Sequence, residues 1–244
     1  MQIEILTTAQ AALQYDFSHC VAVVIDVFRA TSVITTALYN GAAGVIPVAT
    51  VDDAFATAQR LGRASVLLGG ERNADPIPGF DLGNSPRLYN PESISGKTII
   101  LTTTNGTLAL QASKHADAVY AASMLNYKAV SARLAQLSPS RLVIVCSGTD
   151  GRPALEDELC AARICSSLDA NNPQSVVYAS DEALAVRLLA CAFQDSAANP
   201  FSLSHHYATL VSKGYADDVN FCISHDGDID CLPVLSQDGT LHKA

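Results

Sequence analysis

The sequence predicts an α/β fold, with a mainly parallel β-sheet flanked by helices and a helix-rich C-terminal part that ends in short strands. The first observation is a set of continuous apolar runs rich in β-branched residues, such as Val21–Ile25, which are typical of strands buried on both faces. The second is that these runs alternate with segments of helical periodicity. With 244 residues and 49% hydrophobic content, the chain can bury a core without disulfides.

The first 150 residues alternate strands and helices in order. The predicted strands are 21–25, 45–48, 65–68, 98–101, 118–120 and 142–145. The predicted helices are 31–39, 51–61, 106–112 and 126–136. The first of these helices should stop at Asn40–Gly41, and Thr50 or Asp52 should cap the second.

Beyond Glu156 the pattern changes to helices at 155–168, 181–193 and 202–213. Two strand-like pieces follow at 219–223 and 232–235, separated by Asp-Gly turns. We therefore expect an α/β region over 1–150 that carries most of the site loops. The helix-rich part over 151–244 should pack with it as one assembly.

Charge and composition exclude several classes of function. The net charge of −9 and the pI near 4.9 argue against nucleic acid as a partner, because its backbone needs basic surface. No apolar run approaches the roughly 20 residues of a membrane span. Seven cysteines without a C-x-x-C pair, mostly in apolar runs, indicate reduced thiols and a cytoplasmic location. We expect a small anionic partner, and a homodimer is left open.

Four polar clusters follow predicted strands at equivalent places. They are 26–32, 71–85, 102–107 and 146–152, the last leading into Glu156–Asp157. Because the carboxyl ends of parallel strands share one edge of a sheet, we expect these clusters to converge on one site.

Carboxylates in these clusters suit a hard cation such as Mg²⁺, which takes oxygen ligands. Asp26, Glu71, Asp81 and Asp157 are the candidate metal ligands and catalytic carboxylates. Asp26 can also be a nucleophile or a helix cap. The other three can instead bind backbone N–H groups or a helix dipole. The Thr-rich turn at 102–107 and the turn at Ser147–Thr149 offer hydroxyls and N–H groups to an anion, although helix capping explains them equally well.

Two further features leave alternatives open. Cys146 and Arg152 have the C-x5-R spacing of a cysteine-phosphatase loop, but Thr149 stands where that loop usually has glycine. A packed cysteine at a strand end is the simpler interpretation. His205 and His206 lie on a predicted surface helix and are expected to be solvated. A non-catalytic anion-binding protein also remains an alternative.

Taken together, the clusters resemble the 2-phosphosulfolactate phosphatase family. The resemblance covers about residues 21–235, and the loop around Asp81 is its most specific piece. It rests on the segments 24–31, 70–73, 77–86, 102–107, 146–149, 155–157 and 159–161, with Asp218, Val219, Cys222 and Pro233. Pro153–Ala154 departs from the aromatic residue and serine expected there, and Phe28 replaces a more usual leucine.

The resemblance implies an α/β fold and Mg²⁺-dependent hydrolysis of 2-phospho-3-sulfolactate, a step towards coenzyme M. For this reaction we expect Arg29, Arg72 and the 103–107 turn to hold the phosphate, while Arg152 or Asn84 meets the sulfonate or carboxylate. The candidate substrate-binding residues are therefore Arg29, Ser32, Arg72, Asn84, Thr103, Asn105, Gly106, Thr107, Ser147, Gly148, Thr149 and Arg152. Water attack and an aspartyl-phosphate intermediate through Asp26 both remain open.

Overall fold

The strands form one sheet that is mainly parallel. The computed structural model describes residues 1–171, 175–193 and 199–244. Along the sheet the strand order is β5-β4-β6-β3-β11-β10-β7-β2-β8-β1-β9. The strands are β1 (Gln2–Leu6), β2 (Val21–Ile25), β3 (Gly44–Pro47), β4 (Val66–Arg72), β5 (Asp75–Pro76), β6 (Thr98–Thr102), β7 (Ala118–Ala122), β8 (Arg141–Cys146), β9 (Val177–Tyr178), β10 (Pro233–Leu235) and β11 (Leu241–Lys243).

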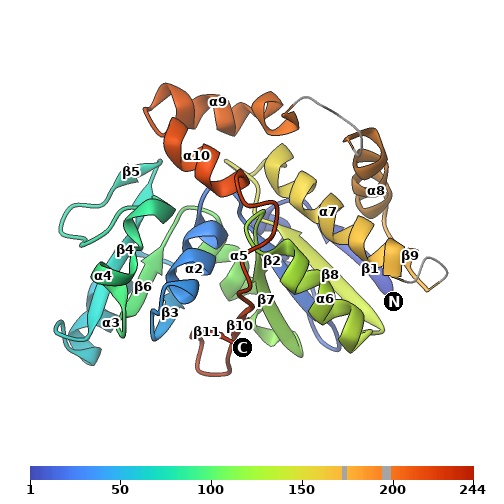
Figure 1. Cartoon of the computed structure of the whole chain (residues 1–244). Coiled ribbons are helices and arrows are strands. Elements are labelled where there is room, and N and C mark those ends of the chain that lie inside the picture. The colour runs from blue at the N-terminus through green and yellow to red at the C-terminus, as the bar shows by residue number, and fades with distance from the viewer. Residues whose placement is uncertain (172–174, 194–198) are drawn as a thin grey trace.

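The sheet consists of two parallel blocks joined by an antiparallel hairpin. Strands β4, β6 and β3 pair in parallel in one block, and β7, β2, β8, β1 and β9 pair in parallel in the other. The short strand β5 pairs antiparallel with β4 at the edge of the first block. The hairpin β10–β11 lies between them and pairs antiparallel with β7 and β3. It lies at the lower centre of Figure 1, next to the C-terminus. The predicted α/β class is confirmed, with C-terminal strands inserted at the middle of the sheet.

Helices cover both faces of this sheet. They are α1 (Ala9–Ala12), α2 (Ala30–Tyr39), α3 (Val51–Leu61), α4 (Pro91–Ile94), α5 (Gly106–Ala112), α6 (Tyr127–Leu137), α7 (Leu155–Asn171), α8 (Asp181–Phe193), α9 (His205–Ser212) and α10 (Ala216–Ile223). Strand β2 shows why two cores form. Its residues Val21, Val23 and Ile25 pack in a cluster with α6 and α7, whereas Ala22 and Val24 pack in a second cluster with α2 and α5. Alternate side chains of a strand point to opposite faces, so both faces are buried.

Most predicted elements are present near their expected bounds. Helix α3 begins as predicted, because Thr50 accepts from the Asp53 N–H and the Asp53 side chain accepts from the Thr50 N–H. The expected strand at 219–223 is wrong, since these residues belong to α10. Val219 and Cys222 are buried three residues apart, which is the period of a helix. The first strand, β1, was not predicted.

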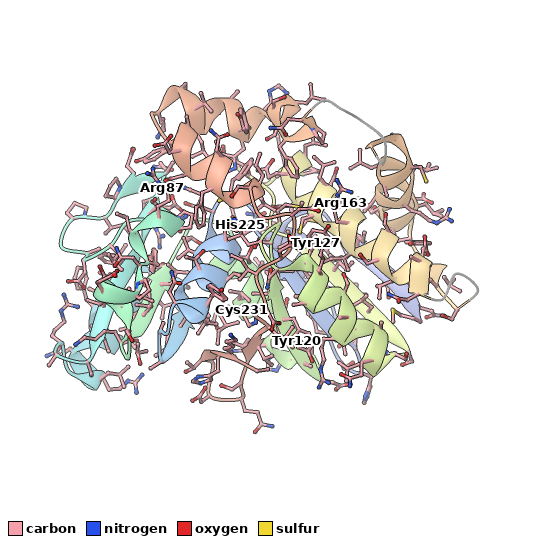
Figure 2. The ribbon with its side chains drawn as sticks, in the orientation of Figure 1. Arg87, Tyr120, Tyr127, Arg163, His225 and Cys231 are labelled. Carbon is pink, nitrogen blue, oxygen red and sulfur yellow. The ribbon has the colours of Figure 1, made fainter. Side chains whose placement is uncertain are left out.

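Helices α9 and α10 pack against each other and lie across the top of the molecule in Figure 1. Side-chain contacts fasten this C-terminal segment to the rest of the chain. Arg87, labelled in Figure 2, pairs with Asp217 of α10 at 3.0 Å. Tyr127 of α6, labelled in the same figure, donates to Asp226 at 3.1 Å. Among the described helices, none combines the length and apolarity that a membrane crossing requires.

Candidate functional site

A pocket of about 240 Å³ draws on all four predicted clusters. The first cluster supplies Asp26, Phe28 and Arg29, and the second supplies Glu71, Asn73, Ala74 and Asn84. Thr104 and Asn105 come from the third, Thr149 and Asp150 from the fourth, and His206, Thr209, Leu210 and Lys213 from α9 and its end. The predicted convergence is confirmed, although strands of both parallel blocks contribute to it.

Asp26 lies at the carboxyl end of β2 and is 8% exposed. Its Oδ1 accepts from the Ala30 N–H at 3.1 Å. Gly106 approaches so closely that a Cβ there would lie 2.6 Å from Asp26 Oδ2, which explains why this position needs glycine. Burial raises the pKa of Asp26 to about 6, against the Ala30 hydrogen bond and the charge of His206, which both lower it.

Glu71 lies at the end of β4 and ties two loops together. Its Oε1 accepts from the Thr104 N–H at 2.8 Å, and its Oε2 accepts from the Ala74 N–H at 2.7 Å. The Thr104 hydroxyl donates to both oxygens. Glu71 therefore borders the pocket while it fixes the loop after β6.

Asp81 and Asp157 do not line the pocket. Asp157 is 2% exposed and accepts from the N–H groups of Val27 and Gly148, which joins the loops after β2 and β8. Asp81 pairs with Arg63 and accepts from the Leu68 N–H. Both carboxylates thus bind groups of the protein itself, and a metal-ligand role for either stays a prediction.

Arg29 is a buried cation on the pocket wall. One guanidinium nitrogen pairs with Asp218 of α10 at 2.7 Å, and another donates to the Ala74 carbonyl. The guanidinium carbon lies 4.2 Å from the centre of the Tyr215 ring. Asp218 also accepts from the Ser85 hydroxyl at 2.6 Å, so one carboxylate of α10 holds both Arg29 and the loop that carries Asn84.

The other predicted substrate-binding residues fall into two groups. Asn84, Asn105 and Thr149 line the pocket, and Gly106 contacts Asp26. The remaining residues do not line the pocket. Ser32 donates to the Val27 carbonyl, and the Thr103 and Thr107 hydroxyls each accept from the other residue's N–H. Arg72 donates to the carbonyls of Glu71 and Ala49 and to the Thr102 hydroxyl. Arg152 lines an adjoining pocket of about 660 Å³. Ser147 and Gly148 belong to the loop after β8 and do not line the pocket.

Two buried oxygen atoms near the site have no hydrogen-bond partner among the described residues. They are Asn84 Oδ1 and Ser147 Oγ. Buried polar atoms are nearly always paired, and an unpaired one costs about 1–3 kcal/mol. Asn84 lines the pocket, so its free oxygen is a natural contact for a bound cation or donor.

His206 was not predicted as a site residue, and the expectation that it is solvated is wrong. Its side chain is 19% exposed and its Nδ1 lies 3.0 Å from Glu156 Oε1. Lys213, at the end of α9, was also missed and is a second pocket cation. His205 is exposed, as expected. The two adjacent histidines differ in exposure because α9 packs with His206 towards the pocket and His205 towards solvent.

Cys146 is fully buried and does not line the pocket. Burial, with the nearby Asp157 charge, raises the pKa of the Cys146 thiol well above its ordinary value. A nucleophilic cysteine needs a lowered pKa and access to substrate, so this geometry argues against a thiolate mechanism.

The oxygen ligands of the pocket suit Mg²⁺ only if substrate and water complete its coordination shell. No group of three or more His, Cys, Asp or Glu side chains in the described part of the chain is arranged to hold a metal ion. Mg²⁺ commonly uses one or two carboxylates and completes its shell with phosphate oxygens and water. Asp26 and Asn84 line the same pocket, so they are the candidate ligands of such a site.

Known proteins resemble this chain over most of its length. The family described as 2-phosphosulpholactate phosphatase matches residues 6–238. A probable 2-phosphosulfolactate phosphatase of Caldanaerobacter subterraneus subsp. tengcongensis is 42% identical over 214 residues, which are 87% of this chain and 86% of the relative. Similar proteins with the same name in Thermotoga petrophila and Clostridium beijerinckii are 43% and 37% identical. These matches cover 84% and 91% of this chain, and 85% and 92% of the respective relatives.

Proposed function

Because the chain belongs to the 2-phosphosulfolactate phosphatase family, we propose that it hydrolyses 2-phospho-3-sulfolactate to 3-sulfolactate and phosphate in the Asp26 pocket, with Mg²⁺. Family membership makes the protein a phosphoric monoester hydrolase. The observation that carries the assignment of the site is the meeting of all four strand-end clusters around one small polar pocket. An active site at the carboxyl ends of sheet strands is the usual arrangement in α/β proteins.

The charge of the pocket supports a metal requirement. Its lining holds three carboxylates (Asp26, Glu71 and Asp150) against two permanent cations. Both cations are already paired, Arg29 with Asp218 and Lys213 with Asp75. A phosphate monoester carries about −1.5 to −2 charges at pH 7, and the substrate adds a carboxylate and a sulfonate. Such a ligand needs additional positive charge, and Asp26 with Asn84 Oδ1 would hold the ion that supplies it. Bound Mg²⁺ would neutralise phosphoryl charge and lower the pKa of a bound water.

The side chains of the protein would do the rest by positioning. Arg29 is pre-ordered by Asp218 and Tyr215, so its guanidinium loses little freedom when an anion binds. Lys213 adds a cation from α9, and Thr104 with Asn105 presents polar groups from the loop after β6. Phosphoryl transfer leaves little covalent work to the protein, so such positioning and charge neutralisation provide most of the catalysis.

Location and assembly are separate proposals. All seven cysteines are free, and six of them are buried, which favours the reducing cytoplasm. The sequence leaves a homodimer open, and sedimentation equilibrium of the purified protein measures its oligomeric state.

Phosphate release from 2-phospho-3-sulfolactate tests the function, with Mg²⁺ and with EDTA in parallel. We expect turnover with Mg²⁺, loss in EDTA and recovery when Mg²⁺ is returned. Cys146→Ser should keep its activity, because the thiol is buried away from the pocket. Activity that resists EDTA and disappears in Cys146→Ser would contradict the proposal and favour the cysteine mechanism.

Two other outcomes distinguish the remaining alternatives. Stoichiometric binding without phosphate release at any Mg²⁺ concentration would identify a non-catalytic anion-binding protein. A phosphoenzyme trapped by acid quench, and absent in Asp26→Asn, would identify an aspartyl-phosphate intermediate. Direct attack by water leaves no such species.

A further inference from the structure

Glu156 is a buried carboxylate that contacts a pocket residue, His206, without lining the pocket itself. It belongs to the first turn of α7 and is 1% exposed. Its Oε2 accepts from the Ser204 hydroxyl at 2.6 Å, and its Oε1 lies 3.0 Å from His206 Nδ1. Burying a carboxylate costs free energy unless it is paired, and here Ser204 and His206 are the partners that stabilise it.

Ser204 and the start of α9 fix the geometry of this pair. The Ser204 oxygen also accepts from the Tyr207 N–H as the N-cap of α9, so the same hydroxyl caps the helix and orients Glu156. His206 is the second residue of that helix. The Thr149 hydroxyl lies 3.1 Å from the same Nδ1, and the Phe28 ring lies against the imidazole at a centroid distance of 6.3 Å. These contacts lock the ring on the pocket wall.

The arrangement determines which ring nitrogen is available. A carboxylate only accepts hydrogen bonds, so Nδ1 carries the proton that it shares with Glu156. Among the described residues, Nε2 has no partner. A histidine oriented by a carboxylate at one nitrogen and open at the other is the arrangement that enzymes use for proton transfer.

We propose that His206 is the general acid of the reaction and that Glu156 is its positioning residue. This inference rests on the phosphatase activity described above. The acid is the imidazolium form, in which Nδ1 keeps its proton towards Glu156 and Nε2 carries a second proton. When the bond between phosphorus and the ester oxygen breaks, its electron pair goes to that oxygen, and the Nε2 proton moves to it, which leaves His206 neutral. The product is the neutral hydroxyl of sulfolactate. Water adds to phosphorus and gives H₂PO₄⁻, which releases one proton to solvent, and His206 takes a proton back from solvent.

The chemistry of the substrate explains why such a residue is needed. The leaving group is an alkoxide, which is strongly basic and leaves slowly without a proton. General acid catalysis by a positioned side chain typically contributes about 10²–10⁴-fold. The imidazolium form would also add positive charge to a pocket whose lining carboxylates outnumber its permanent cations.

The test compares two substrates that differ in their leaving group. 2-Phospho-3-sulfolactate needs a proton on the leaving oxygen, whereas acetyl phosphate releases weakly basic acetate, which does not. His206→Gln should lower kcat on the first by about 10²–10⁴-fold and on the second by less than about tenfold. Glu156→Gln should show the same selectivity with a smaller loss, because it misorients the acid without removing it. His205→Gln, at the exposed neighbouring position, is the matched control and should leave both rates unchanged.

The outcomes separate the proposal from a structural role. A folded His206→Gln enzyme that loses both activities equally, or neither, overturns the assignment. Thermal midpoints of all variants show whether they fold, and His206→Asn provides a second variant with the same expected selectivity. A wild-type enzyme that hydrolyses neither substrate contradicts the phosphatase function itself, so the two failures are distinguishable.

Discussion

Replacing Asp218 with alanine should destabilise the protein and weaken the site together. Asp218 pairs with Arg29 at 2.7 Å, and the two side chains are 6% and 2% exposed. Its second oxygen accepts from Ser85 at 2.6 Å. The substitution would leave the guanidinium of Arg29 buried, and its remaining partners among the described residues would be the Ala74 carbonyl and the Tyr215 ring.

The magnitude follows from this burial. Removing one partner of a buried ion pair costs about 3–5 kcal/mol, because the remaining charge is uncompensated. For a chain of this length, each kcal/mol lowers the thermal midpoint by about 2–4 °C, so a decrease of about 6–20 °C is expected. Substrate affinity should also fall, since Arg29 is no longer held on the pocket wall.

The adjacent residue is the control. Asp217 also lies in the first turn of α10, but its pair with Arg87 is exposed, with side-chain exposures of 76% and 50%. Asp217→Ala should cost at most about 1 kcal/mol. Because both carboxylates interact with the same helix dipole, urea unfolding of the two variants isolates the effect of burial. Equal destabilisation of both would refute the reasoning.

Two further predictions concern the pocket carboxylates. In EDTA, Asp26→Asn should be more stable than the wild type above pH 6, by about 3 kcal/mol, and inactive. The folded pKa of Asp26 is raised from 3.8 to about 6, so the folded state binds more protons across that window and the wild type loses stability as the pH rises through it. Urea unfolding of both proteins at pH 4 and pH 8 measures this, and an asparagine variant that is less stable at pH 8 contradicts it. Glu71→Gln should lose about 10²–10³ in turnover while the fold survives, because the loop that carries Thr104 is no longer held by a carboxylate. Phosphate release and circular dichroism test it, and wild-type turnover in the variant would exclude the role.

The sequence was sufficient to predict the elements whose hydrophobic pattern is unambiguous. The apolar run of β2 and the capped helix α3 appear where their residues indicate. Segment 219–223 belongs to a helix although its sequence predicts a strand, because five residues with apolar side chains at 219, 221 and 223 are too short a stretch to separate the two periods. β1 pairs with β8 and β9, so its strand partners come from residues more than 100 positions away, and its own five residues carry little signal.

The part of the site that comes from loops after strands could be predicted from the sequence. Residues that follow strands, such as Asp26 and Asn105, line the pocket as expected. His206 and Lys213 could not be found in this way, because they lie on a helix that reaches the pocket only through tertiary packing. Asp157 resembles a site residue in sequence, yet it accepts backbone N–H groups in the structure. Local sequence does not distinguish a carboxylate that binds a ligand from one that holds a loop.

A crystal structure of the protein with Mn²⁺ in place of Mg²⁺ and with 3-sulfolactate tests the central claim most directly. We predict an anomalous manganese peak bound by Asp26 and Asn84 Oδ1, with the ligand between Arg29 and His206. Manganese bound at Asp81 or Asp157 instead, with no ion or ligand in the Asp26 pocket, would contradict the account.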